Sequence, residues 1–163
     1  MSDDGSPITV VVQNELDDGD PEWEVDLDRW RDLAQAALHT ERVGSGELNL
    51  LFVGETKMAE LAIEHMGGDG PTDVLAFPID GASLTDMLTA VPDPVPTLLG
   101  DVIICPAVAR RYAAANGGAF DDEVALLVVH GVLHVLGHDH TEPAETVTMK
   151  AREQMLLAAH HRS

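Results

Sequence analysis

The feature that most constrains the fold is a run of apolar residues from Val124 to Leu136. In a helix, this run places apolar side chains on nearly every side, so the helix must be buried. It is shorter than the about 18 residues that a membrane span needs, and it therefore predicts the central helix of a globular core. We expect Asp121 to cap this helix, Asp122 and Glu123 to favour its positive start, and Gly137 to end it.

The rest of the chain alternates short β-branched runs with amphipathic segments, which indicates an α/β (α+β) fold. We expect one small domain over residues 1–163, with an about four-stranded mixed sheet flanked by helices. Two segments fall outside this pattern: residues 1–7, which we expect to be disordered, and residues 80–97, a proline-containing long loop. The expected strands cover 8–13, 47–53, 73–77 and 100–105, an acidic turn covers 14–22, and the further helices cover about 27–38, 56–65, 106–115 and 143–160.

The charge of the chain is strongly acidic. Nine basic residues stand against 29 acidic ones, for a net charge of −20. Taken alone, this argues against nucleic-acid binding, because phosphate contacts come from Lys and Arg. The single cysteine, Cys105, excludes an internal disulfide and fits a reducing compartment. The acidic start of the chain is unlike a secretory signal, so we expect a cytoplasmic protein without a membrane segment.

Four histidines lie between residues 130 and 140. His130 and His134 are four residues apart and share one face of the predicted helix, which suits two ligands of one metal ion. His138 and His140 are alternative third ligands: the first continues the spacing, and the second follows a turn at Gly137. Three imidazoles leave one position of a tetrahedral Zn²⁺ open to water, as in catalytic zinc sites, although this ligand set also suits nickel, cobalt or copper.

The remaining histidines lack metal-ligand spacing. A lone buried histidine is usually a hydrogen-bonded core residue, and we expect His160 and His161 to be exposed to solvent. Zinc proteases of the H-E-x-x-H type carry a glutamate base directly after the first histidine. Gly131 stands at that position, so the general base of such a protease is missing here.

Three blocks of this sequence resemble the YbeY family of bacterial endoribonucleases and rRNA maturation factors. HGVLHVLGHDH at 130–140 resembles the family pattern H-G-x-L-H-L-x-G-Y-D-H. PTDVLAFP at 71–78 and LGDVII at 99–104 resemble P-T-D-V-L-S-F-P and L-G-D-I-V-I, in the same order. Together with Glu47, Leu48 and Asn49, the resemblance extends over roughly residues 47–157.

The resemblance implies a zinc site at His130, His134 and His140, with one zinc ion per chain and no organic cofactor. It implies cleavage of phosphodiester bonds in single-stranded RNA, maturation of small-subunit rRNA and ribosome quality control, with rRNA and the small ribosomal subunit as partners. Asp139 would orient a ligand histidine, or stabilise its own turn. The chain departs from the family at His138, where tyrosine is usual, and in residues 62–70, which lack the family's arginine.

Two rival hypotheses remain beside the endoribonuclease. One is a ribosome-assembly binding factor with a structural zinc and no cleavage activity, and the other is a different metallohydrolase such as a peptidase. Candidate phosphate contacts are Arg110 and Arg111, the only adjacent basic pair, although such a pair is more often a solvated helix face. Asp73 and Asp101 either line the cleft or act as cap and turn residues.

Overall fold

The computed structural model describes residues 8–16, 26–41, 43, 46–66, 72–78, 98–137 and 143–161. The predictions for residues 1–7 and for the loop 80–97 fall outside the described residues. Within the described parts, no helix is long and apolar enough to cross a membrane.

The four described strands form one mixed sheet, as predicted. They are β1 (Ile8–Glu15), β2 (Gly46–Val53), β3 (Val74–Pro78) and β4 (Leu98–Ile104), and their order in the sheet is β1-β2-β4-β3. β1, β2 and β4 run parallel, whereas β3 is antiparallel to β4. β1 extends beyond the predicted strand, because Asn14 and Glu15 pair with Phe52 and Val53 of β2 instead of starting an acidic turn.

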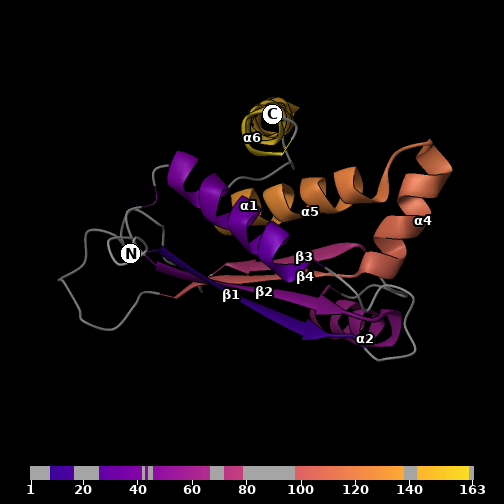
Figure 1. Cartoon of the computed structure of the whole chain (residues 1–163). Coiled ribbons are helices and arrows are strands. Elements are labelled where there is room, and N and C mark those ends of the chain that lie inside the picture. Colours follow the sequence, from indigo (N-terminus) through magenta and orange to yellow (C-terminus); the bar gives the residue numbers. More distant parts are fainter. Residues whose placement is uncertain are drawn as a thin grey trace.

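Helices cover both faces of this sheet (Figure 1). α1 (Leu27–Thr40) and α5 (Phe120–Val135) lie on one face, with α6 (Pro143–His160) packed on the outside of α5. α2 (Glu55–Met66) lies on the opposite face, and α4 (Pro106–Asn116) leads from β4 to α5. α5 contacts β3, β4 and three helices, which confirms the predicted central helix.

The start of α5 differs from the prediction. The helix is capped by Ala119, which has an extended backbone, and Asp121 lies inside the first turn with Asp122 and Glu123. The Phe120 side chain packs against the hydrophobic core. The helix therefore begins at Phe120 and not after Asp121. Asp122 and Glu123 do stand at the positive end of the helix, as expected.

The end of α5 follows the sequence. Val135 is its last residue, and Gly137 adopts φ +102°, a conformation that side chains other than glycine rarely take.

Gly131 lets α5 approach the sheet closely. A Cβ atom built on Gly131 would lie 2.5 Å from Cγ1 of Val102 on β4, far inside van der Waals contact. The absence of a side chain therefore sets the height of the helix above the sheet. It also leaves no room for a glutamate at the position that an H-E-x-x-H protease would require.

Candidate metal centre

The two predicted histidine ligands lie one turn apart on α5. The ring centres of His130 and His134 are 6.2 Å apart, and the rings are tilted by 48°. With a metal–nitrogen bond of about 2.0 Å, the centre of a ligand ring lies about 3.2 Å from the ion, so two rings at the tetrahedral angle lie about 5.2 Å apart. The separation in this structure is larger, so the two side chains would have to rotate toward each other to share a tetrahedral ion.

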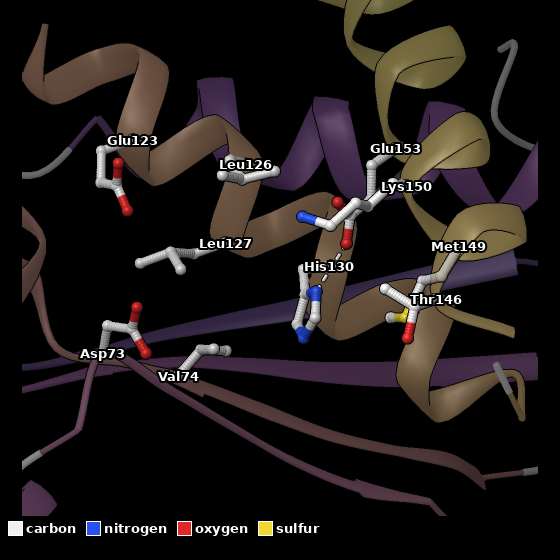
Figure 2. A pocket seen from close by; sticks show the side chains of 10 residues that line it. All are labelled: Asp73, Val74, Glu123, Leu126, Leu127, His130, Thr146, Met149, Lys150 and Glu153. Atoms are coloured by element: carbon white, nitrogen blue, oxygen red, sulfur yellow. Dashed lines mark hydrogen bonds and ion pairs between the residues drawn. The ribbon is translucent and has the colours of Figure 1, made fainter. Parts of the chain in front are cut away.

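Glu153 on α6 orients the first histidine. Its Oε2 atom lies 2.6 Å from Nδ1 of His130. An ionised carboxylate only accepts hydrogen bonds, so this contact places the ring proton on Nδ1, and in that tautomer Nε2 carries the lone pair of the ring. Figure 2 shows the second ring nitrogen pointing away from Glu153.

Glu153 is a candidate functional residue that no sequence motif singled out. It is the one buried charged residue within the described parts of the chain. Met149 and Leu156, one turn to either side on α6, are also buried, so the carboxylate stands on the apolar face of its helix. A charge on that face is costly without a partner, and this signal could have marked Glu153 in the sequence.

The third ligand is outside the described residues, as are His138, Asp139 and His140. The choice between His138 and His140, and the orienting role of Asp139, therefore stay predictions. Within the described ranges, no three His, Cys, Asp or Glu residues gather in a metal-binding arrangement. His134 is half-buried, and its Nδ1 atom is shielded from solvent.

A pocket of about 240 Å³ opens beside His130 between α5, α6 and the start of β3 (Figure 2). His130 and Glu153 lie toward one end, and Asp73 and Glu123 lie at the other. Partial burial, and next the nearby Asp73 carboxylate, raise the pKa of Glu123 above its usual value. The lining side chains are Asp73, Val74, Glu123, Leu126, Leu127, His130, Thr146, Met149, Lys150 and Glu153.

The other candidates from the sequence have different positions. Asp101 accepts a hydrogen bond from Nδ2 of Asn49 at 2.9 Å and does not line the pocket, whereas Asp73 does. Arg111 donates to Glu55 at 2.8 Å and thereby lowers the pKa of that carboxyl. Arg110 stacks over the Phe120 ring at 4.2 Å, so both arginines have partners in the fold and neither lines the pocket.

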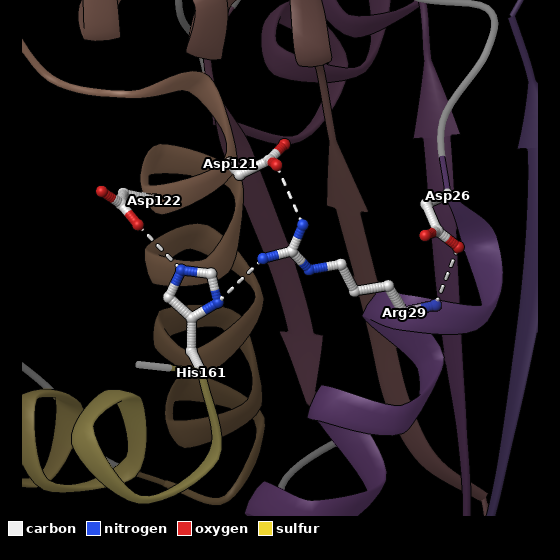
Figure 3. A network of polar contacts seen from close by, with 5 residues as sticks. All are labelled: Asp26, Arg29, Asp121, Asp122 and His161. Atoms are coloured by element: carbon white, nitrogen blue, oxygen red, sulfur yellow. Dashed lines mark hydrogen bonds and ion pairs between the residues drawn. The ribbon is translucent and has the colours of Figure 1, made fainter. Parts of the chain in front are cut away.

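His161 contradicts its predicted exposure. Its side chain is buried, with Nε2 lying 2.8 Å from Oδ1 of Asp122 and Nδ1 facing Arg29 (Figure 3). Arg29 also donates to Asp121 at 2.9 Å, which joins the end of α6 to α1 and α5. No sequence motif indicated this network, because its members lie far apart along the chain. His160 is exposed, as expected.

The fold and the site define a class: a small mixed α/β domain whose central helix carries two histidines one turn apart, one of them in contact with a buried carboxylate. Comparison with known proteins narrows this class. A family profile described as Endoribonuclease YbeY matches residues 15–161, and the chain belongs to the YbeY family.

Individual relatives agree with this assignment. Endoribonuclease YbeY of Salinispora tropica is 46% identical over 139 residues, which cover 83% of this chain and 88% of the relative. Endoribonuclease YbeY of Frankia casuarinae is 42% identical over 153 residues, 93% of this chain and 74% of the relative. The solution structure of a Thermotoga maritima protein shares the fold, with a TM-score of 0.56 at 22% identity, covering 92% of this chain and 90% of that one.

Proposed function

We propose that this protein is a zinc-dependent endoribonuclease that cleaves single-stranded RNA. In this proposal the protein acts in the cytoplasm. It takes part in the maturation of small-subunit rRNA and in ribosome quality control, and its partner is the small ribosomal subunit. The observation that carries the proposal is the His130–Glu153 contact, which presents one ring nitrogen of a paired histidine for metal binding. The names of the curated relatives support the endoribonuclease activity.

In this proposal, His130 and His134 hold the zinc ion together with His140. A zinc ion bound in this way supplies Lewis-acid polarisation of a phosphoryl oxygen and a water molecule of lowered pKa. Glu153 keeps the His130 ring in one tautomer and one orientation, so that its Nε2 atom stays available as a ligand. Asp139 is proposed to orient a second ligand ring.

Lys150 is our candidate for holding the RNA phosphate. Residues 62–70 contain no Arg or Lys, so the chain lacks the arginine that the family resemblance led us to expect. Lys150 is the one cation among the side chains that line the described pocket, and it is exposed to solvent. An exposed ammonium group in the same pocket as His130 suits a phosphate as a point charge.

The proposal is tested by measuring zinc content and RNA cleavage on the same protein samples. The full chain is compared with His134→Ala and with His39→Ala, a matched control at an exposed histidine of α1. We expect His134→Ala to lose zinc and cleavage together and the control to keep both. A zinc-free His134→Ala protein that still cleaves RNA would falsify the proposal. The pair His140→Ala and His138→Ala then identifies the third ligand, which we expect to be His140.

The net charge of −20 and the missing arginine favour one alternative, a ribosome-assembly factor with a structural zinc. This alternative predicts that pure, zinc-loaded protein does not cleave RNA. It also predicts that a folded His130→Ala variant restores rRNA maturation in a deletion strain, whereas the endoribonuclease proposal predicts failure. The peptidase hypothesis loses support, because Val102 occupies the space that a glutamate at position 131 would need.

A further inference from the structure

The pocket beside His130 has two chemically different parts. Its walls are apolar, formed by Val74 of β3 and by Leu126 and Leu127 of α5 among others. Its far end is acidic, where the side chains of Asp73, just before β3, and Glu123, on α5, point toward each other (Figure 2). At about 240 Å³ it is smaller than the about 300–1,000 Å³ typical of sites for drug-sized molecules, so it suits a single ring system.

Glu123 is the acidic group with the clearest capacity to bind a ligand. It is half-buried, and no described residue gives its carboxylate a hydrogen bond or an ion pair. Partial burial, and next the neighbouring Asp73, raise its pKa, because both disfavour the charged form of the carboxyl. A ligand that brings N–H donors to this end would supply the missing partners.

We infer that this pocket receives one unpaired nucleobase of the RNA, with guanine as the preferred base. The inference rests on the proposed function, since it names the nucleotide held next to His130. The apolar walls contact the flat faces of the base, as RNA-binding proteins do for splayed-out bases. Guanine presents two adjacent donors, N1–H and N2–H₂, and a carboxylate offers two acceptor oxygens to match them.

The other bases match the acidic end less well. Adenine and cytosine each present one amino donor beside a ring-nitrogen acceptor, and the acceptor would face a carboxylate. Uracil presents one N–H donor between two carbonyl oxygens, so two acceptors would face the carboxylates. Because an unmatched polar group costs free energy when it is buried, we expect uracil to bind most weakly.

The experiment uses the zinc-free full chain, titrated with guanosine 5′-monophosphate and with uridine 5′-monophosphate and followed by the NMR methyl signals of Val74 and Leu127. We expect the guanine nucleotide to bind about tenfold more tightly and to shift both signals. Glu123→Gln keeps the size of the side chain but removes one acceptor, and it should abolish the preference. Glu60→Gln removes the same charge from an exposed position of α2 and should leave the preference intact.

Three results would overturn the inference. The first is equal affinity for both nucleotides, and the second is an unchanged preference in Glu123→Gln. The third is that Mg²⁺ alone shifts the methyl signals of Val74 and Leu127 while neither nucleotide does. Asp73→Asn tests the same end of the pocket if Glu123→Gln does not fold. Neither zinc nor cleavage enters this measurement. A protein that prefers guanine but cleaves no RNA therefore refutes the proposed function only, and one that cleaves without the preference refutes this inference only.

Discussion

Two histidine–carboxylate pairs connect α5 with α6 and with the residue that follows α6. In one pair the carboxylate is the more buried partner, and in the other pair the imidazole is. In the pair His130–Glu153, the carboxylate side chain is 8% exposed and the imidazole 26%. In the pair His161–Asp122, the imidazole is 6% exposed and the carboxylate 63%. The two contacts have similar lengths, 2.6 and 2.8 Å, so distance alone does not distinguish them.

The reversal distinguishes the contact proposed to be functional from one that only joins elements of the fold. Both ring nitrogens of His161 face protein groups, Asp122 and Arg29, so this ring offers no nitrogen to a metal. His130 uses Nδ1 for Glu153 and keeps Nε2 on the pocket side. A buried carboxylate needs a close partner, and this need holds the more exposed imidazole in one orientation.

The largest expected effect is the loss of zinc from His130→Ala. We expect zinc content to fall from about one ion per chain to nearly none, because a ligand is removed. The matched variant His161→Ala should keep its zinc and lose about 1–2 kcal/mol of unfolding free energy, because its hydrogen bonds are structural. Metal analysis by mass spectrometry and urea unfolding measure both quantities. Loss of zinc from both variants would remove the distinction between the two pairs.

The next effect concerns the two carboxylates. Glu153→Ala should weaken zinc affinity about 10–100-fold, because the His130 ring loses the group that orients it. Glu153→Gln should recover part of this loss, since its amide oxygen still accepts the Nδ1 proton. Asp122→Ala is the control and should leave zinc affinity unchanged. Competition with a chelator gives these affinities, and an unaltered affinity in Glu153→Ala would mean that the buried carboxylate only supports packing.

A change beneath α5, the helix to which both pairs belong, should lower the stability of the fold. Gly131→Ala brings a Cβ atom against Val102, and overpacking of this kind costs about 1–3 kcal/mol. Gly118→Ala is the control, because a Cβ there meets no atom within 4 Å. Adding Val102→Ala should restore part of the unfolding free energy of Gly131→Ala in urea titrations. If the double variant recovers nothing, the close helix–sheet contact is not the cause.

The smallest effect is expected for the exposed ion pair between Arg111 and Glu55. It measures how much free energy of unfolding a carboxylate contact contributes when it is not buried. The hydrogen bond from Arg111 lowers the pKa of Glu55 from its usual 4.5. The stabilisation is therefore present above that value and is lost as the pH falls through the lowered pKa. Glu55→Gln should cost at most about 0.5 kcal/mol at pH 7 and nothing once Glu55 is protonated. Thermal unfolding across pH, with Glu60→Gln as control, measures this difference.

Much of the fold was predictable because its signals are local. Short β-branched and apolar runs predicted the four strands, helical periodicity predicted α1, a long apolar run predicted the central α5, and Gly137 marked the end of α5. The errors at Asn14, Glu15 and Asp121 lie at element ends. There, strand pairing with β2 and the packing of Phe120 outweighed local polarity.

The sequence by itself determined the metal-ligand spacing of His130 and His134, since residues four apart on a helix share a face whatever surrounds them. Only the tertiary structure decided which carboxylate meets which imidazole. Glu153 is 23 residues from His130, and Asp122 is 39 residues from His161. Such pairs form where α6 packs against α5, and the buried surface of the whole domain sets that packing, which no local pattern of residues encodes.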